Sequence, residues 1–120
     1  HSSPRRQRQM CIRDRYGTGN KYYITSLSSS PSPTLRLTEG QVWVFDQSDS
    51  TNGGHPFRFS TTPNGTHAGG SEYTTGVTTS GIPGQSGAFT RIEVAAGAPT
   101  LYYYCNVHSG MGGTAYTPNA

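Results

Sequence analysis

Short stretches in which apolar and polar side chains alternate recur along the chain, and turn-forming residues separate them. In TLRLTEG, Leu35 and Leu37 face one way and the arginine between them faces the other. In PFRFS, Phe57 and Phe59 alternate with an arginine in the same manner. This alternation is the pattern of a half-buried β-strand. Strands are therefore expected in KYYITSL (21–27), TLRLTEG (34–40), QVWVFDQS (41–48), PFRFS (56–60), AFTRIEV (88–94) and TLYYYC (100–105).

Some strands leave their orientation open. QVWVFDQS carries valines at 42 and 44 on one face, with Trp43 and Phe45 on the other, so it is buried on both sides or lies near an end of a sandwich. In AFTRIEV, Phe89 or its neighbours are expected to share the inner face with Ile92 and Val94. In TLYYYC, the alternation places the middle tyrosine, residue 103, on the face opposite to residues 102 and 104.

A long polar segment rich in Gly, Thr and Ser lies between Ser60 and Gly87. Val77 and Ile82 are its expected aliphatic anchors, together with Tyr73. A loop of this length is usually functional or contains short strands. Since no ten-residue stretch has helical periodicity, the pattern predicts an all-β sandwich or barrel.

The first fifteen residues, HSSPRRQRQMCIRDR, differ from the rest of the chain. MCIRDR matches the translation of a transposon end used in sequencing libraries, and segments of that origin are excluded from fold reasoning. We expect residues 1–15 to be a non-native arm, residues 16–117 to form one domain and residues 118–120 to be a tail. The alternative is a genuine basic arm that binds nucleic acid or a membrane surface.

The arm changes the charge and the cysteine count. The chain has 9 Lys and Arg against 6 Asp and Glu, a net charge of +3. Five arginines and one aspartate belong to the arm, so the remainder carries a net charge of −1. A domain without a basic patch is not expected to bind nucleic acid, and no apolar run approaches the ~20 residues of a membrane span. Without Cys11, a Cys11–Cys105 disulfide is not expected, and Cys105 is a ligand, a reactive thiol or a small buried hydrophobe.

The stretch CNVHSGMGG places a thiol, an imidazole and a thioether within seven residues, at Cys105, His108 and Met111. Another imidazole, His55, sits at the start of the PFRFS strand. Two histidines and a cysteine in a plane, with a weak axial methionine, are the ligands of a blue-copper site. Taken singly, these residues are explained as a buried thiol, a surface histidine and a core methionine. His67, in NGTHAGG, is expected to lie in a flexible loop without a metal partner.

With these residues the chain resembles the cupredoxins, the family of plastocyanin, amicyanin and pseudoazurin. The C-x2-H-x2-M spacing is similar to that of amicyanin, and a histidine precedes the cysteine by fifty residues. The resemblance covers about residues 16–116. It implies a Greek-key β-sandwich or barrel that holds one copper ion, with His55, Cys105 and His108 as equatorial ligands and Met111 as the axial ligand.

Two positions depart from the family pattern. In plastocyanin and pseudoazurin the axial methionine lies two residues further on, where this chain has Gly113. A loop of that form would leave the axial position empty. The second departure is Pro56, because in many cupredoxins the residue after the first histidine donates its backbone N–H to the cysteine sulfur. Proline has no N–H, and the loss of that hydrogen bond would by itself lower the reduction potential.

The resemblance implies a single-electron carrier, with a redox partner protein docking near His108 and an extracytoplasmic location (periplasmic, secreted or virion surface). Enzymatic activity is not expected, since the chain has neither a second histidine cluster nor a Ser-His-Asp set. The alternative is a structural or adhesive module of a larger multidomain surface or virion protein, with copper structural or absent. Copper storage or delivery would call for clusters of Met or His that the chain lacks.

Overall fold

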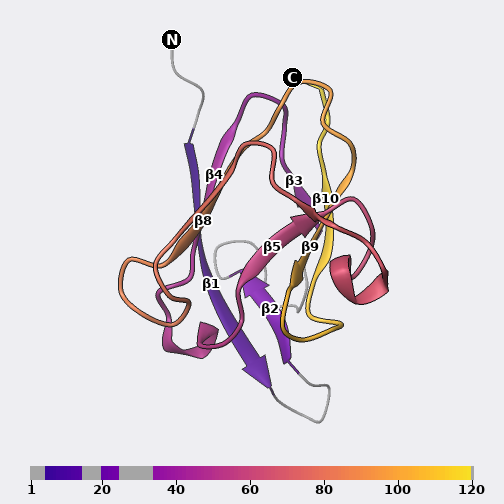
Figure 1. Ribbon diagram of the computed structural model, residues 1–120. Helices are drawn as coiled ribbons and strands as arrows, with labels where there is room; N and C mark the ends of the chain where they lie inside the picture. The colour runs from indigo at the N-terminus through magenta and orange to yellow at the C-terminus, as the bar shows by residue number, and fades with distance from the viewer. Residues whose placement is uncertain (1–4, 15–19, 25–33, 120) are drawn as a thin grey trace.

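A computed structural model describes residues 5–14, 20–24 and 34–119; in the first two ranges it describes the backbone and the side chain of Tyr22. The described residues form two five-stranded sheets, with the strand orders β2-β1-β4-β8-β7 and β3-β10-β9-β5-β6 (Figure 1). The strands are β1 (Arg5–Asp14), β2 (Asn20–Ile24), β3 (Leu35–Arg36), β4 (Val42–Asp46), β5 (Phe57–Ser60), β6 (Glu72–Tyr73), β7 (Val77–Ser80), β8 (Phe89–Glu93), β9 (Leu101–Cys105) and β10 (Gly113–Tyr116).

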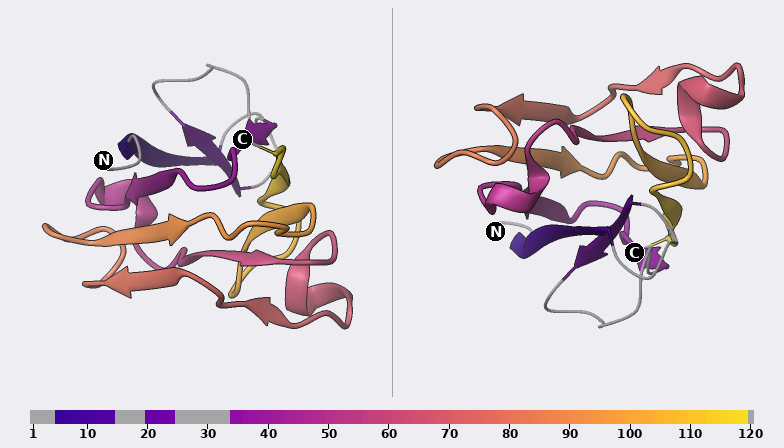
Figure 2. Two further views of the ribbon diagram at one scale, coloured as in Figure 1. Left: turned by 90° about the horizontal axis from the view of Figure 1, so that it is seen from above. Right: turned by 90° about the horizontal axis from the view of Figure 1, so that it is seen from below.

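The two sheets lie face to face, as the views from above and below show (Figure 2). β1 runs parallel to β4, and β3 runs parallel to β10, whereas the other strand pairs are antiparallel. The described residues contain no α-helix and two short 3-10 helices, η1 (Ser50–Asn52) and η2 (Gly65–Ala68). The predicted all-β sandwich is confirmed. Its Greek-key, cupredoxin form stays a prediction.

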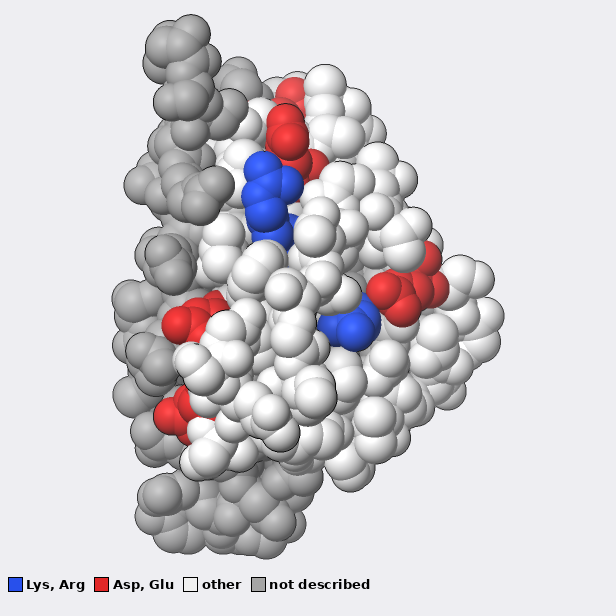
Figure 3. All heavy atoms as spheres, turned by 60° about the vertical axis from the view of Figure 1, so that its left-hand side comes forward, with Lys and Arg blue, Asp and Glu red and all other residues white. Residues whose placement is uncertain are grey.

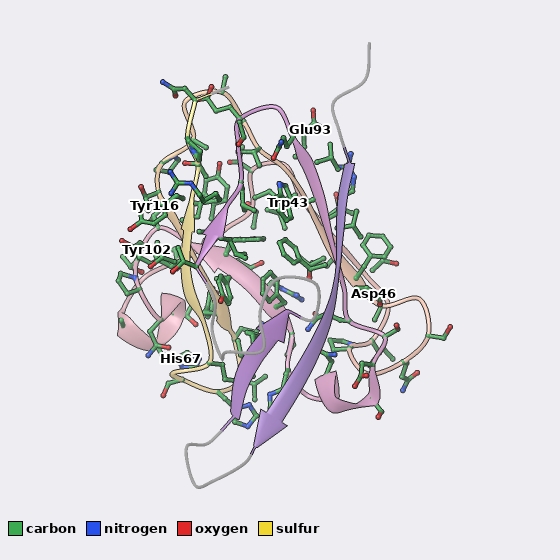
Figure 4. The ribbon with its side chains drawn as sticks, turned by 180° about the vertical axis from the view of Figure 1, so that it is seen from behind. Trp43, Asp46, His67, Glu93, Tyr102 and Tyr116 are labelled. Atoms are coloured by element: carbon green, nitrogen blue, oxygen red, sulfur yellow. The ribbon has the colours of Figure 1, made fainter. Side chains whose placement is uncertain are left out.

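The apolar positions predicted from alternation fill the space between the sheets. Trp43 and Phe45 of β4 belong to the core (Figure 4), and Val44 on the opposite face is also buried. β4 is thus buried on both faces, one of the two orientations that its sequence allows. Each large apolar side chain that is fully buried contributes about 1.5–3 kcal/mol to folding. The core cluster also contains Tyr22, Leu35, Leu37, Phe57, Phe59, Ile92, Val94, Leu101, Tyr103, Cys105, Met111 and Ala115.

The inner face of β8 begins at Thr90, a neighbour of Phe89, as the predicted alternatives allow. Thr90 shares this face with the buried Ile92, whereas Phe89 is half-buried on the other face. The Thr90 hydroxyl can face inward because it donates a hydrogen bond to the carbonyl oxygen of Phe57, at 3.0 Å. The prediction that Ile82 is an anchor is wrong, because its side chain is 62 % exposed in the turn that follows β7.

The long polar segment between Ser60 and Gly87 contains short strands, as its length predicts. It forms η2, then β6 at the edge of one sheet and β7 at the edge of the other. Val77 and Tyr73 pack against the core while remaining partly exposed. The segment thereby joins the two sheets along one side of the sandwich.

Residues 5–14, most of the expected non-native arm, form β1 between β2 and β4. Backbone pairing does not depend on the identity of the side chains, so the origin of the arm stays a prediction.

The described surface carries few charged side chains. In Figure 3, acidic and basic side chains are scattered among uncharged residues on one face. Arg91 and Glu93 form one partly exposed ion pair, with 3.9 Å between nitrogen and oxygen. Within the described ranges, no helix has the length and apolar character needed to cross a membrane.

Candidate metal centre

The pairing of β5 with β9 brings the first histidine to the cysteine. Phe57 lies directly opposite Cys105 in this antiparallel ladder, and opposite residues point to the same face. His55 precedes Phe57 by two residues, so its side chain follows the same direction. A histidine and a cysteine fifty residues apart therefore meet on the inner face, where the ladder ends.

Three side chains converge at this end of the sandwich. The sulfur of Cys105 lies 3.9 Å from Nδ1 of His55 and also 3.9 Å from Nδ1 of His108. The two imidazole rings are 4.6 Å apart between centroids, with 38° between their planes. One potential ligand atom from each residue lies within 4.8 Å of the other two. The structure thus brings together three of the predicted ligands.

These distances fit a metal ion shared by the three atoms. An imidazole nitrogen about 2.0–2.1 Å and a thiolate sulfur about 2.3 Å from one ion lie 3.9 Å apart when the angle at the ion is about 125–130°. That angle is wider than the tetrahedral value of about 109° that structural zinc sites adopt. It is close to the trigonal arrangement of a His2Cys copper site.

The three side chains differ in their access to solvent. Cys105 is fully buried and His55 is 9 % exposed, whereas His108 lies at the surface. Burial lowers the pKa of His55 from its ordinary value, and the nearby His108 lowers it further. A lowered pKa keeps the imidazole of His55 neutral near pH 7, the form in which histidine binds metal ions.

The loop from Cys105 to β10 turns Met111 inward. Met111 is 1 % exposed and belongs to the same core cluster as Cys105. At Gly112, a Cβ atom would collide with the carbonyl oxygen of Tyr103, so a residue with a side chain does not fit without movement. Gly113 already pairs with Tyr103 in β10. Met111 therefore lies in the core and Gly113 in a strand, and the axial role of Met111 stays a prediction.

A network of buried hydrogen bonds holds the backbone on both sides of Pro56, beside His55. The backbone N–H after the proline, that of Phe57, donates to Oε1 of Gln47 at 3.1 Å. Nε2 of Gln47 donates to the carbonyl oxygen of His55 at 2.8 Å and to Oδ1 of Asn52 at 3.2 Å. Sequence reasoning missed these polar residues, because nothing in their local pattern distinguishes them from surface amides.

His67, for which the sequence predicts no metal partner, contacts the backbone of Cys105. His67 lies in η2, and its Nε2 is 2.8 Å from the carbonyl oxygen of Cys105 (Figure 4). Its ring also stands edge-on to Tyr104, with 6.2 Å between centroids. This contact joins segments 38 residues apart, so spacing along the sequence contains no signal of it.

The loop that contains η2 also supports the ligand loop. Asn64, in a left-handed conformation with φ of 61°, accepts a hydrogen bond from the N–H of Gly110 at 2.8 Å. Gly65 lies against the ring of Tyr104, since a Cβ added to it would come within 2.6 Å of the ring carbons. The segment therefore covers Tyr104 and fixes the far side of the ligand loop.

Comparisons of this chain with protein families, with curated proteins and with solved structures find no significant match. The assignment of the centre therefore rests on its geometry and on the chemistry of its side chains.

Proposed function

We propose that this protein binds one copper ion through His55, Cys105, His108 and Met111 and carries single electrons, as its resemblance to the cupredoxins implies. The observation that carries the proposal is the pair of equal distances, 3.9 Å, from the Cys105 sulfur to the two Nδ1 atoms. When bound, copper would accept one electron from a reduced partner protein as Cu(II) and give it to an oxidised partner protein as Cu(I).

The donor set suits both oxidation states. A thiolate and a thioether favour Cu(I), and imidazole suits copper in either state. Because Cys105 and Met111 are buried in the core, the surrounding side chains restrict their movement. A site that changes little between the two states exchanges electrons with little rearrangement.

His108 is the proposed point of contact with redox partners. It is the exposed member of the histidine–cysteine cluster, and the neighbouring Val107 is 57 % exposed. A partner protein that approaches His108 from solvent would not need to open the site. His55 and Cys105 remain shielded from water in that arrangement.

Copper titration of the metal-free chain tests the proposal. Cu(II) is added to the 120-residue chain, and visible absorption and EPR spectra are recorded. One equivalent should produce an intense blue absorption band and a compressed copper hyperfine splitting. A reversible one-electron reduction should follow by voltammetry.

The two cysteines provide a matched pair of variants. Cys105→Ser should abolish the blue band, whereas Cys11→Ser should leave it unchanged. Weak binding at several sites that survives Cys105→Ser would contradict the proposal. The structural or adhesive module would then be the better reading.

A further inference from the structure

The geometry points to a role for Tyr22 and Gln47 as positioning residues: together they form a buried clamp that holds His55 in place for the metal ion. This inference rests on the proposed function. The two side chains come from β2 and from the end of β4, and both donate a hydrogen bond to the carbonyl oxygen of His55, at 2.8 Å each. Both side chains are at most 1 % exposed.

Gln47 acts on both sides of the proline. Its Nε2 donates to the carbonyl oxygen before Pro56, and its Oε1 accepts from the N–H of Phe57 after it. The second N–H of the amide is taken by Oδ1 of Asn52, and the backbone carbonyl of Asn52 accepts the N–H of His55 at 2.9 Å. Just before β5 begins, the side-chain amide of Gln47 therefore provides hydrogen bonds that a neighbouring strand would otherwise provide.

Tyr22 connects two of the proposed ligands. Its hydroxyl donates to the carbonyl oxygen of His55, and its backbone N–H donates to the carbonyl oxygen of Met111 at 3.1 Å. Its ring packs edge-on against Phe57, with 5.0 Å between centroids.

Pro56 removes one backbone donor from the histidine loop, because proline has no N–H to donate. The next N–H along the chain is already bound to Gln47. The histidine loop is therefore held through its carbonyl oxygen, from outside the metal site. Buried polar networks whose groups are all satisfied restrict the conformations of the residues they join.

Gln47→Leu tests the clamp, with Gln41→Leu as its matched control. Gln41 lies just before β4, makes a hydrogen bond with Nε1 of Trp43 at 3.1 Å, and stands at the opposite end of that strand from Gln47. Loss of Gln47 should weaken copper affinity about 10–100-fold, the range typical for partners that orient metal ligands. It should also change the EPR parameters and the reduction potential. Gln41→Leu should leave all three as in the wild type.

Tyr22→Phe is the milder second variant, because it keeps the ring and removes the hydroxyl alone. It should shift the EPR parameters and the potential in a protein that remains fully folded. If Gln47→Leu and Tyr22→Phe both bind copper with the affinity, spectrum and potential of the wild type, the inference is overturned while the copper site itself stands.

The metal-free protein gives an independent test. NMR signals of the His55 ring should be single and sharp in the wild type and broadened or doubled in Gln47→Leu, with Gln41→Leu resembling the wild type. If the wild-type chain forms no blue copper site, the proposed function fails, and these ring signals still decide whether the clamp positions His55. Identical ring signals in all three proteins would overturn the clamp.

Discussion

The two histidines of the centre are held in opposite ways. His55 is buried, and its backbone carbonyl and N–H both take part in a network formed by Tyr22, Gln47 and Asn52. His108 is exposed, and Asn64 holds its loop by accepting a hydrogen bond from the N–H of Gly110. One histidine is thus fixed by polar contacts in the interior, and the other is carried by a surface loop.

For the proposed electron carrier, this difference would separate two requirements. The buried side of the centre would keep the ligands in one arrangement and limit the change in structure between oxidation states. The exposed side brings a ligand to the surface, where a partner can reach it. A site with two buried histidines would be shielded from partners, and a site with two exposed histidines would admit water and lose its fixed geometry.

The largest expected effect comes from removing each imidazole in turn. His108→Gly and His55→Gly should both abolish the blue band of the copper-loaded protein. Added imidazole should restore most of the band in His108→Gly, because the vacated position is open to solvent. It should restore little in His55→Gly, where the position is enclosed. Absorption titrations with imidazole measure this, and equal recovery in the two variants would refute the contrast.

The two loops that contain the histidines should also differ in how well they accept the replacement of a glycine by alanine. Gly112→Ala forces a Cβ against the carbonyl oxygen of Tyr103, and overpacking of this kind costs about 1–3 kcal/mol. Gly53→Ala is the matched control in the histidine loop, where the nearest atom to the new Cβ is 3.4 Å away. Urea unfolding of the metal-free variants gives the comparison. A Gly112→Ala protein as stable as Gly53→Ala would show that the close approach is absent.

A smaller effect is expected at the support of the exposed loop. Asn64→Ala removes the acceptor for the Gly110 N–H, and a hydrogen bond of this type contributes about 0.5–1.5 kcal/mol. Asn64→Asp keeps an acceptor oxygen and should retain most of it. Amide hydrogen exchange at Gly110 should be faster in Asn64→Ala than in Asn64→Asp. Equal protection of Gly110 in the two variants would argue against this contact.

The pH dependence of the metal-free protein provides the finest test. The pKa of His55 is lowered from 6.5 in the folded state, chiefly by burial, so the unfolded chain binds more protons as the pH falls below 6.5. The free energy of unfolding should therefore decrease as the pH is lowered through that range and level off below the folded-state pKa. Urea midpoints measured from pH 7.5 downwards should show this fall. His55→Gln should show a weaker one, and an unchanged slope would mean that another group is responsible.

The sequence predicts the sandwich and the ligands because both depend on local patterns. Alternation identifies the inward positions of Leu35 and Leu37, and the spacing of Cys105, His108 and Met111 lies within a single loop. At β8, alternation leaves the choice between Phe89 and its neighbours open, since a threonine such as Thr90 can also face inward once its hydroxyl donates a hydrogen bond.

The support of the centre could not be predicted in the same way. Tyr22 reaches His55 across 33 residues, and His67 reaches Cys105 across 38. These contacts depend on strand order and register, which become known only when the chain is folded. Gln47 is closer in sequence to His55, but nothing in the sequence distinguishes a buried glutamine from an exposed one. The sequence therefore indicates the candidate ligands, whereas it does not indicate the residues that surround them.

Both ends of the described chain lie far from this centre. β1 begins with Arg5 opposite Val42, and the carbonyl oxygen of Pro118 accepts the N–H of Glu39. These contacts place the two described ends beside the turn that leads into β4, near the top of Figure 1, whereas the loop between β9 and β10, which contains His108, lies in the lower half. An electrode or a bead attached at either described end would therefore leave the exposed histidine facing solution.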